Sequence, residues 1–115
     1  MIDRIRLTAA AKNQLATLKR RTGIEHNNSL CRHALCLSLE HSSMPPKEDL
    51  NFNGGLEIDW RTLTGGNEDL YVNLVLTSLS LNEIEEEIDV KDLLVRHIHR
   101  GLSLMMSREG DFIFV

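Results

Sequence analysis

The sequence predicts a mainly α-helical fold that begins with one short strand. Three observations predict it: 19 of the 115 residues are leucine, only five are aromatic, and apolar residues recur at helical spacing over most of the chain. This length is enough for one hydrophobic core and too short for two, so a single domain is expected over residues 1–115. We divide it into a strand-helix-helix segment (1–40), a connector with a short hairpin or loop (41–66) and a helical pair with a tail (67–115).

The first six residues after the initial methionine alternate in character. Ile2, Arg4 and Arg6 point to one side of an extended chain, and Ile5 and Leu7 point to the other. This alternation predicts a strand over residues 2–7. Because so short a strand is not stable alone, it needs a partner strand, either from this chain or from another copy.

Two helices are expected next, over residues 9–22 and 28–40. Thr8 is suited to cap the first helix and Gly23 to end it in the left-handed conformation. Asn28 is the expected cap of the second helix. The buried stripes are Ala11, Leu15 and Leu18 in the first helix, and Leu30, Cys31, Ala34, Leu35, Ser38 and Leu39 in the second.

The connector contains two turn signals. Pro45 and Pro46 end the preceding helix, and Asn53-Gly54-Gly55 separates residues 50–52 from residues 56–60, which predicts a small hairpin or an ordered loop. Thr64-Gly65-Gly66 is a further break before the next helix.

The last segment predicts two more helices. Asn67 is the expected cap of the first, whose apolar stripe is Leu70, Tyr71, Leu74, Val75 and Leu79. Residues 82–89 are expected to form an acidic turn, and Asp89 caps the final helix. That helix is expected to end at Gly110, before the apolar tail 112–115.

The charge of the chain is unevenly distributed. The whole chain has a formal net charge of −4, but residues 1–40 sum to +4 and residues 41–115 to −8. Such asymmetry is typical of a polyanion-binding surface at the basic end. The alternative is a solvated helix face in which basic residues cluster by chance.

The chemistry-bearing side chains do not predict a metal or catalytic site. Cys31 and Cys36 are five residues apart on a predicted helix, so they point about 140° apart and cannot share one ion with His33. His97 joins an apolar stripe, and His99 lies on another face, where it could form a basic strip with Arg96 and Arg100.

Several other kinds of site and of protein are also disfavoured. The glutamates at positions 83 and 85–87 are interpreted as a solvated turn instead of a magnesium site, and neither glycine pair is followed by the Lys-Ser/Thr of a phosphate-binding loop. No cofactor is expected. No apolar run approaches a membrane span, no secretion signal is visible, and two cysteines favour a cytoplasmic location.

The arrangement of residues 2–40 resembles the ribbon-helix-helix family of DNA-binding proteins. In that resemblance, strands of two chains pair antiparallel, and their outward side chains, here Arg4 and Arg6, enter the major groove. The alternative is a dimerisation module with no ligand. We expect the DNA contacts to be Arg4, Arg6, Lys12, Lys19, Arg20, Arg21 and Asn28, the last at a helix start that presents free amides to a phosphate.

Five short motifs resemble the DndE family of DNA sulfur-modification proteins, and they are distributed over nearly the whole chain. They are Arg4-Ile5-Arg6-Leu7-Thr8, Arg20-Arg21-Thr22-Gly23-Ile24, Asn53-Gly54-Gly55-Leu56-Glu57-Ile58, Thr62-Leu63-Thr64-Gly65 and His97-Ile98-His99-Arg100-Gly101. The resemblance implies a small helical protein of the bacterial phosphorothioation machinery that forms a homotetramer and binds nicked duplex DNA. It also implies that the sulfur chemistry belongs to partners: a cysteine desulfurase, an iron–sulfur sulfurtransferase and an ATPase-type component.

Three functions therefore remain open from the sequence. The first is a non-catalytic DNA-binding subunit of the phosphorothioation system. The second is a protein-interaction subunit of the same complex, whose strand serves self-association. The third, a DNA nickase, would depend on Glu85 or Glu87.

Overall fold

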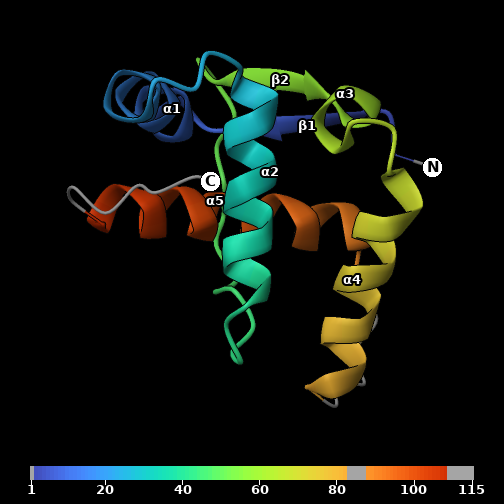
Figure 1. The fold of residues 1–115 in the computed structure, drawn as a ribbon. Coiled ribbons are helices and arrows are strands. Elements are labelled where there is room, and N and C mark those ends of the chain that lie inside the picture. Colours follow the sequence, from blue (N-terminus) through green and yellow to red (C-terminus); the bar gives the residue numbers. More distant parts are fainter. Residues whose placement is uncertain (1, 83–87, 109–115) are drawn as a thin grey trace.

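Two strands and five helices make up the described part of the computed structural model, residues 2–82 and 88–108 (Figure 1). In chain order they are β1 (Arg4–Leu7), α1 (Ala9–Thr22), α2 (Asn27–Leu39), β2 (Leu56–Asp59), α3 (Trp60–Thr64), α4 (Glu68–Leu81) and α5 (Val90–Ser107). The predicted fold class, mainly helical with an N-terminal strand followed by two helices, is confirmed.

The partner of the first strand comes from the same chain. β1 pairs antiparallel with β2, with Arg4 opposite Asp59 and Leu7 opposite Leu56. The predicted alternation is confirmed, since Ile5 and Leu7 are fully buried while Arg4 and Arg6 are exposed. Of the two forms predicted for residues 50–60, the structure has the ordered loop, because β2 pairs with β1 and not with residues 50–52.

The first helix has the predicted ends. The Thr8 hydroxyl accepts a hydrogen bond from the Ala11 amide at 3.1 Å. At the other end, Gly23 adopts a φ of 76° and its amide donates to the Lys19 carbonyl. The predicted buried stripe of Ala11, Leu15 and Leu18 is confirmed.

The second helix and its neighbour differ from the prediction. α2 begins at Asn27 after His26, so Asn28 lies inside the helix and is not its cap. The Asn28 side-chain amide donates to the Thr62 carbonyl at 3.3 Å. The helix α3 is a further difference, because it begins at Trp60, inside the segment 56–60 that the sequence predicts as extended. The Asp59 carboxylate ends that strand by accepting from the Thr62 amide, which starts the helix at Trp60.

The two predicted C-terminal helices are confirmed, but the prediction of which α4 side chains are buried is partly wrong. Asp89 caps α5 by accepting from the Lys91 amide. In α4, Tyr71 and Val75 are buried as predicted, but Leu70 and Leu74 are exposed. The end predicted at Gly110, the tail 112–115 and most of the acidic turn (83–87) lie outside the described residues.

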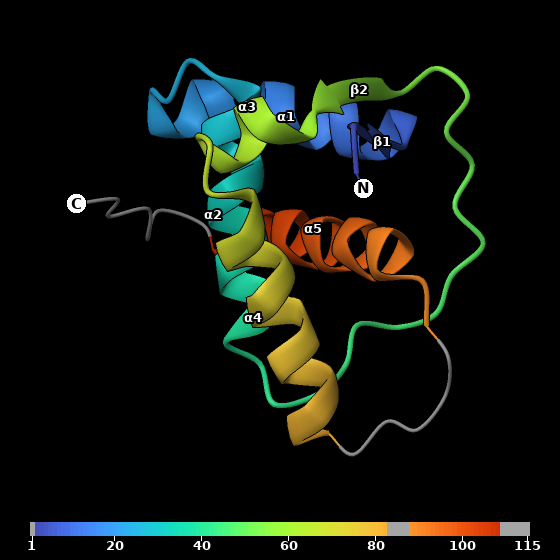
Figure 2. The same cartoon turned by 90° about the vertical axis from the view of Figure 1, so that its right-hand side faces the viewer.

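The core is organised by the crossing of α2 over α5, which Figures 1 and 2 show from two directions. All seven elements contribute buried apolar side chains to it. The sheet and α1 lie above α5, and α4 lies at one edge of the molecule. No helix in residues 2–82 and 88–108 is long and apolar enough to cross a membrane.

Candidate nucleic-acid interface

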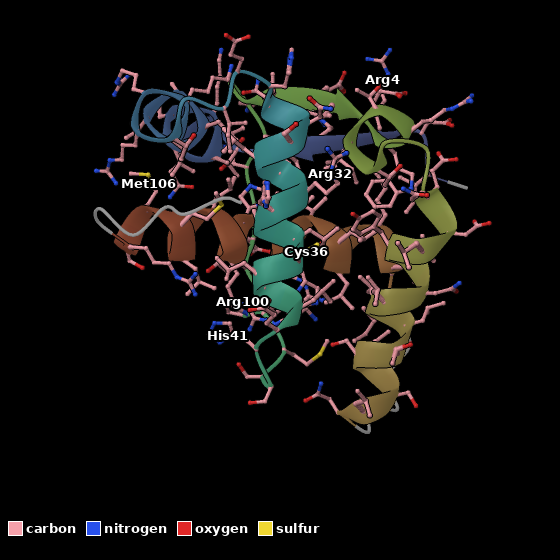
Figure 3. All side chains as sticks on the ribbon, in the orientation of Figure 1. Arg4, Arg32, Cys36, His41, Arg100 and Met106 are labelled. Atoms are coloured by element: carbon pink, nitrogen blue, oxygen red, sulfur yellow. The ribbon has the colours of Figure 1, made fainter. Side chains whose placement is uncertain are left out.

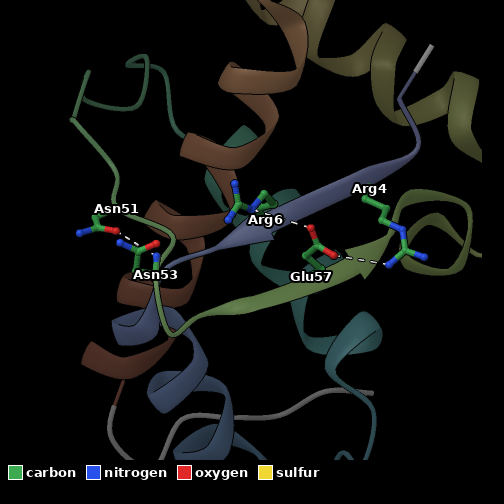
Figure 4. Close-up of polar contacts among 5 residues, drawn as sticks. All are labelled: Arg4, Arg6, Asn51, Asn53 and Glu57. Atoms are coloured by element: carbon green, nitrogen blue, oxygen red, sulfur yellow. Dashed lines mark hydrogen bonds and ion pairs between the residues drawn. The ribbon is translucent and has the colours of Figure 1, made fainter.

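The outer face of the sheet carries both signs of charge. Arg4 and Arg6 lie there on β1, and one carboxylate of β2, Glu57, contacts both: its Oε2 lies 3.5 Å from Arg4 Nη1 and its Oε1 3.8 Å from Arg6 Nε (Figure 4). Asp59, the register partner of Arg4, lies on the same strand two residues further. Two arginines and two carboxylates therefore balance on this face.

The neighbours of Arg4 and Arg6 restrain them further. The Arg6 guanidinium lies 5.4 Å from the centre of the Phe52 ring, a cation–π distance. The pKa of Asp59 is held below its ordinary value by hydrogen bonds from Thr62 and by the nearby guanidiniums of Arg4 and Arg61. The carboxylate thus stays ionised opposite Arg4. A phosphate approaching this face would have to compete with it.

The helix α1 presents positive charge without this compensation. Its 14 residues include four cations and no carboxylate. Lys12 and Lys19 are seven residues apart, so they lie on one stripe of the helix about 10 Å from each other. Lys19, Arg20 and Arg21 crowd the last turn, where the helix dipole favours cations.

Two of these cations have contacts within the chain that leave donors available. Arg20 Nη2 donates to the Thr17 hydroxyl at 3.3 Å. Arg21 Nη1 donates to the carbonyl of Met106, which Figure 3 labels at the end of α5 nearest α1. Each guanidinium has five N–H groups, so most of its donors remain for a phosphate.

The predicted contact residues thus fall into separate places. Arg4 and Arg6 lie on the sheet, and Arg20 lies about 16 Å beyond the start of α1. Lys12 lies between these two groups along the chain. Asn28 belongs to neither, because its amide is bonded to α3.

Beside the sheet lies an exposed cation, Arg61, that sequence reasoning did not include among the contacts. It lies on α3 and acts electrostatically on Asp59 together with Arg4. Arg61 belongs to the acidic part of the sequence, so a charge count by segment gives no reason to select it. Only the pairing of β2 with β1 brings Asp59, and with it Arg61, close to Arg4.

The basic residues of α5 do not form the strip that the sequence left open. Arg100 donates to the Ser38 hydroxyl at 2.8 Å and to the Ser38 and Ser43 carbonyls (2.7 and 2.8 Å), at the end of α2 where Figure 3 labels it. Arg96 is almost completely buried and its Nε lies 3.1 Å from an Asp92 carboxylate oxygen. These cations connect parts of the chain to one another.

Both histidines of this helix are held neutral. Burial, followed by the charges of Arg100 and Arg96, lowers the pKa of His97 to about 4, and its Nδ1 lies 2.7 Å from the Ser38 hydroxyl. Burial also lowers the pKa of His99. Its Nδ1 donates to the Val95 carbonyl, and its Nε2 accepts from the Thr8 amide just before α1.

A cavity of about 700 Å³ adjoins the first turn of α1. Its lining includes the carboxylates of Glu48 and Asp49 as well as Arg96 and His99. Because both signs of charge share the lining and its cations are bound within the chain, the cavity does not select an anion.

The cysteines are placed as small side chains, not as ligands. Cys31 is buried, which raises the pKa of its thiol to about 12, and Cys36 is exposed on α2 (Figure 3). In the described ranges, no three His, Cys, Asp or Glu side chains are grouped so that they could hold a metal ion. The glutamates at 83 and 85–87 lie outside those ranges.

Comparison with known families identifies the chain. Residues 4–110 match the family model described as DNA sulphur modification protein DndE. The chain belongs to the DndE family. Its fold is also similar to the crystal structure of DndE from Escherichia coli B7A, described as involved in DNA phosphorothioation modification, with a TM-score of 0.71 and 22% sequence identity over 91% of this chain and 97% of that one. A search of curated proteins found no match.

Two of the DndE motifs owe their glycines to close packing. A Cβ atom at Gly55 would lie 1.8 Å from the Leu7 carbonyl oxygen, where β1 and the loop before β2 meet. A Cβ atom at Gly101 would lie 1.9 Å from the Ala34 carbonyl oxygen, where α5 crosses α2. In this DndE chain the two motifs therefore fix the fold, whereas α1 carries positive charge that forms no ion pair with the described residues.

Proposed function

We propose that this chain is a non-catalytic, DNA-binding subunit of the bacterial DNA phosphorothioation system, with a preference for nicked duplex. Membership of the DndE family supports the assignment to the phosphorothioation system. The observation that carries DNA binding is α1, a helix with four cations and no carboxylate. Lys and Arg side chains that neutralise phosphates and release counterions supply most sequence-independent affinity for DNA.

The proposed contact residues differ in how much each should contribute to the affinity for DNA. Lys12, Lys19, Arg20 and Arg21 on α1 are the main ones. Arg4 and Arg6 contribute less, because Glu57 must be displaced or repelled when a phosphate approaches. Asn28 contributes least, since its amide already donates to Thr62.

The rest of the chain fits a role among partners. We propose a homotetramer that works in the cytoplasm with an iron–sulfur sulfurtransferase and an ATPase-type component, and that needs no cofactor of its own. The net charge of −8 over residues 41–115 would turn that part away from DNA and toward these proteins.

A salt series with charge-matched variants tests the site. The variant K19A/R20A should bind nicked duplex more weakly, and the slope of log K against log salt should become shallower by about 1.8, or 0.9 for each lost phosphate contact. R4A/R6A should change the slope by less. The control K47A/K91A removes two exposed cations elsewhere and should bind as the wild type does.

The result that overturns the placement is an unchanged affinity and slope in K19A/R20A. The second candidate, a protein-interaction subunit, is favoured by one observation, the charge balance on the outer face of the sheet. It predicts weak binding of DNA that is insensitive to salt, together with tight capture of the sulfur-transfer partners.

A further inference from the structure

The helix α4 has an apolar face that nothing covers in the described part of the chain. Four of its leucines are exposed: Leu70 by 53%, Leu74 by 41%, Leu76 by 44% and Leu81 by 79%. Figures 1 and 2 show α4 at the edge of the molecule, with its C-terminal end extending beyond α5. Exposed apolar patches on a folded protein mark sites of interaction with a partner.

Three of these leucines share one stripe of the helix. Leu70, Leu74, Thr77 and Leu81 follow one another at intervals of four, three and four residues, the spacing of the seam in a two-stranded coiled coil. The Thr77 hydroxyl donates to the Asn73 carbonyl at 2.8 Å, so its polar group is satisfied within the helix. Leu76 lies on another side, two residues or about 200° from Leu74.

The charges on α4 indicate what covers this seam. Glu68 and Asp69 in the first turn are the only charged residues of α4, and the 12 residues that follow are uncharged. A face without charges offers no complement to a charged partner, but it is complementary to itself. We propose that α4 packs against α4 of a second copy of this chain, through Leu70, Leu74, Thr77 and Leu81, a pairing that rests on the homotetramer proposed above and supplies one of its contacts.

The same charges fix the direction of the pair. In a parallel pair, the first-turn carboxylates Glu68 and Asp69 of both copies would lie at the same end of the pair, beside the seam, which like charge disfavours. In an antiparallel pair they lie a helix length apart, about 20 Å, and the two helix dipoles oppose each other favourably. The antiparallel register then brings Leu70 opposite Leu81 of the second copy and Leu74 opposite Thr77.

Mass in solution tests the pairing without DNA, so its failure would leave the proposed DNA binding standing. L74E should lower the mass measured by light scattering to half the wild-type value or less, toward the 13.1 kDa of one chain. L76E is the matched control, because Leu76 is as exposed as Leu74 but lies off the seam, and it should keep the wild-type mass. Unchanged mass in L74E, or equal loss in L76E, would overturn the proposal.

A cross-link tests the direction of the pair with cysteines, which keep small uncharged side chains in the seam. In a C36S background, the double variant L70C/L81C has cysteines about 16 Å apart along one helix, beyond the roughly 7 Å limit for a disulfide, so any 70–81 bond joins two chains. Mild oxidation should give this bond, identified by peptide mass. Bonds of 70 to 70 and 81 to 81 would overturn the antiparallel arrangement, and a chain that stays uncross-linked would overturn the pair itself.

Discussion

Gly101 is the residue on which the crossing of α2 and α5 depends. Its missing side chain lets the two helices approach until a Cβ atom would lie 1.9 Å from the Ala34 carbonyl oxygen. Because that neighbour is backbone, G101A must separate the helices and should lower the free energy of unfolding by about 3 kcal/mol or more, at the upper end of overpacking effects. Urea unfolding measures this. S103A, an exposed change on the same helix, should stay within about 0.5 kcal/mol.

His97 makes stability depend on pH at the same crossing. Its pKa is about 4 in the folded chain and 6.5 when unperturbed, so the unfolded chain binds more protons between these values. The stabilisation from the neutral ring is therefore complete above pH 6.5 and is lost as the pH falls toward 4, by about 2–3 kcal/mol.

The variant H97Q isolates this effect. It should reduce the slope of the unfolding free energy against pH between 4 and 6.5 and leave the share of His99, whose pKa burial also lowers. H41Q, at an exposed histidine, is the control for a histidine substitution outside the crossing. Carboxylates titrate in all three proteins, so the comparison removes their share. Equal slopes in wild type and H97Q would contradict the burial of a neutral His97.

At the scale of elements, local signals were sufficient where one residue decides the outcome. Helix α1 begins after Thr8 and ends at Gly23 as predicted, and the alternation of apolar and polar residues identified the strand β1. Contacts between distant residues were not visible in the sequence. Glu57 pairs with Arg4 and Arg6 because β1 pairs with β2 of the same chain. The outer face of the sheet, expected to be basic, therefore carries positive and negative charges in equal number.

The error in α4 has a related cause. Helical periodicity marks apolar side chains but does not tell which of them face the core of the same chain. Tyr71 and Val75 do, while Leu70 and Leu74 form the seam proposed above. The sequence thus predicted the fold class and the basic segment, whereas only the structure shows which of the predicted basic side chains are paired within the chain.

The two proposals meet at the scale of the whole molecule. Figure 1 shows α1 and α4 at opposite ends of the chain, whose longest dimension is 40 Å. Pairing through α4 therefore places the two copies of α1 far apart. Both copies can contact the same duplex only if that duplex is long enough to reach from one to the other. At 3.4 Å per base pair, one chain spans at most about 12 base pairs and a pair at most about 24.

Duplex length should consequently separate the paired from the unpaired protein. On nicked duplexes of about 24 base pairs, the wild type and L76E should show about twice the salt slope of L74E, because each α4 pair brings two α1 helices to the duplex instead of one. On duplexes of about 12 base pairs, all three should show similar slopes. Fluorescence anisotropy across a salt series measures both. If L74E is a confirmed monomer and still has the wild-type slope on the long duplex, each chain binds DNA independently and pairing through α4 serves another purpose.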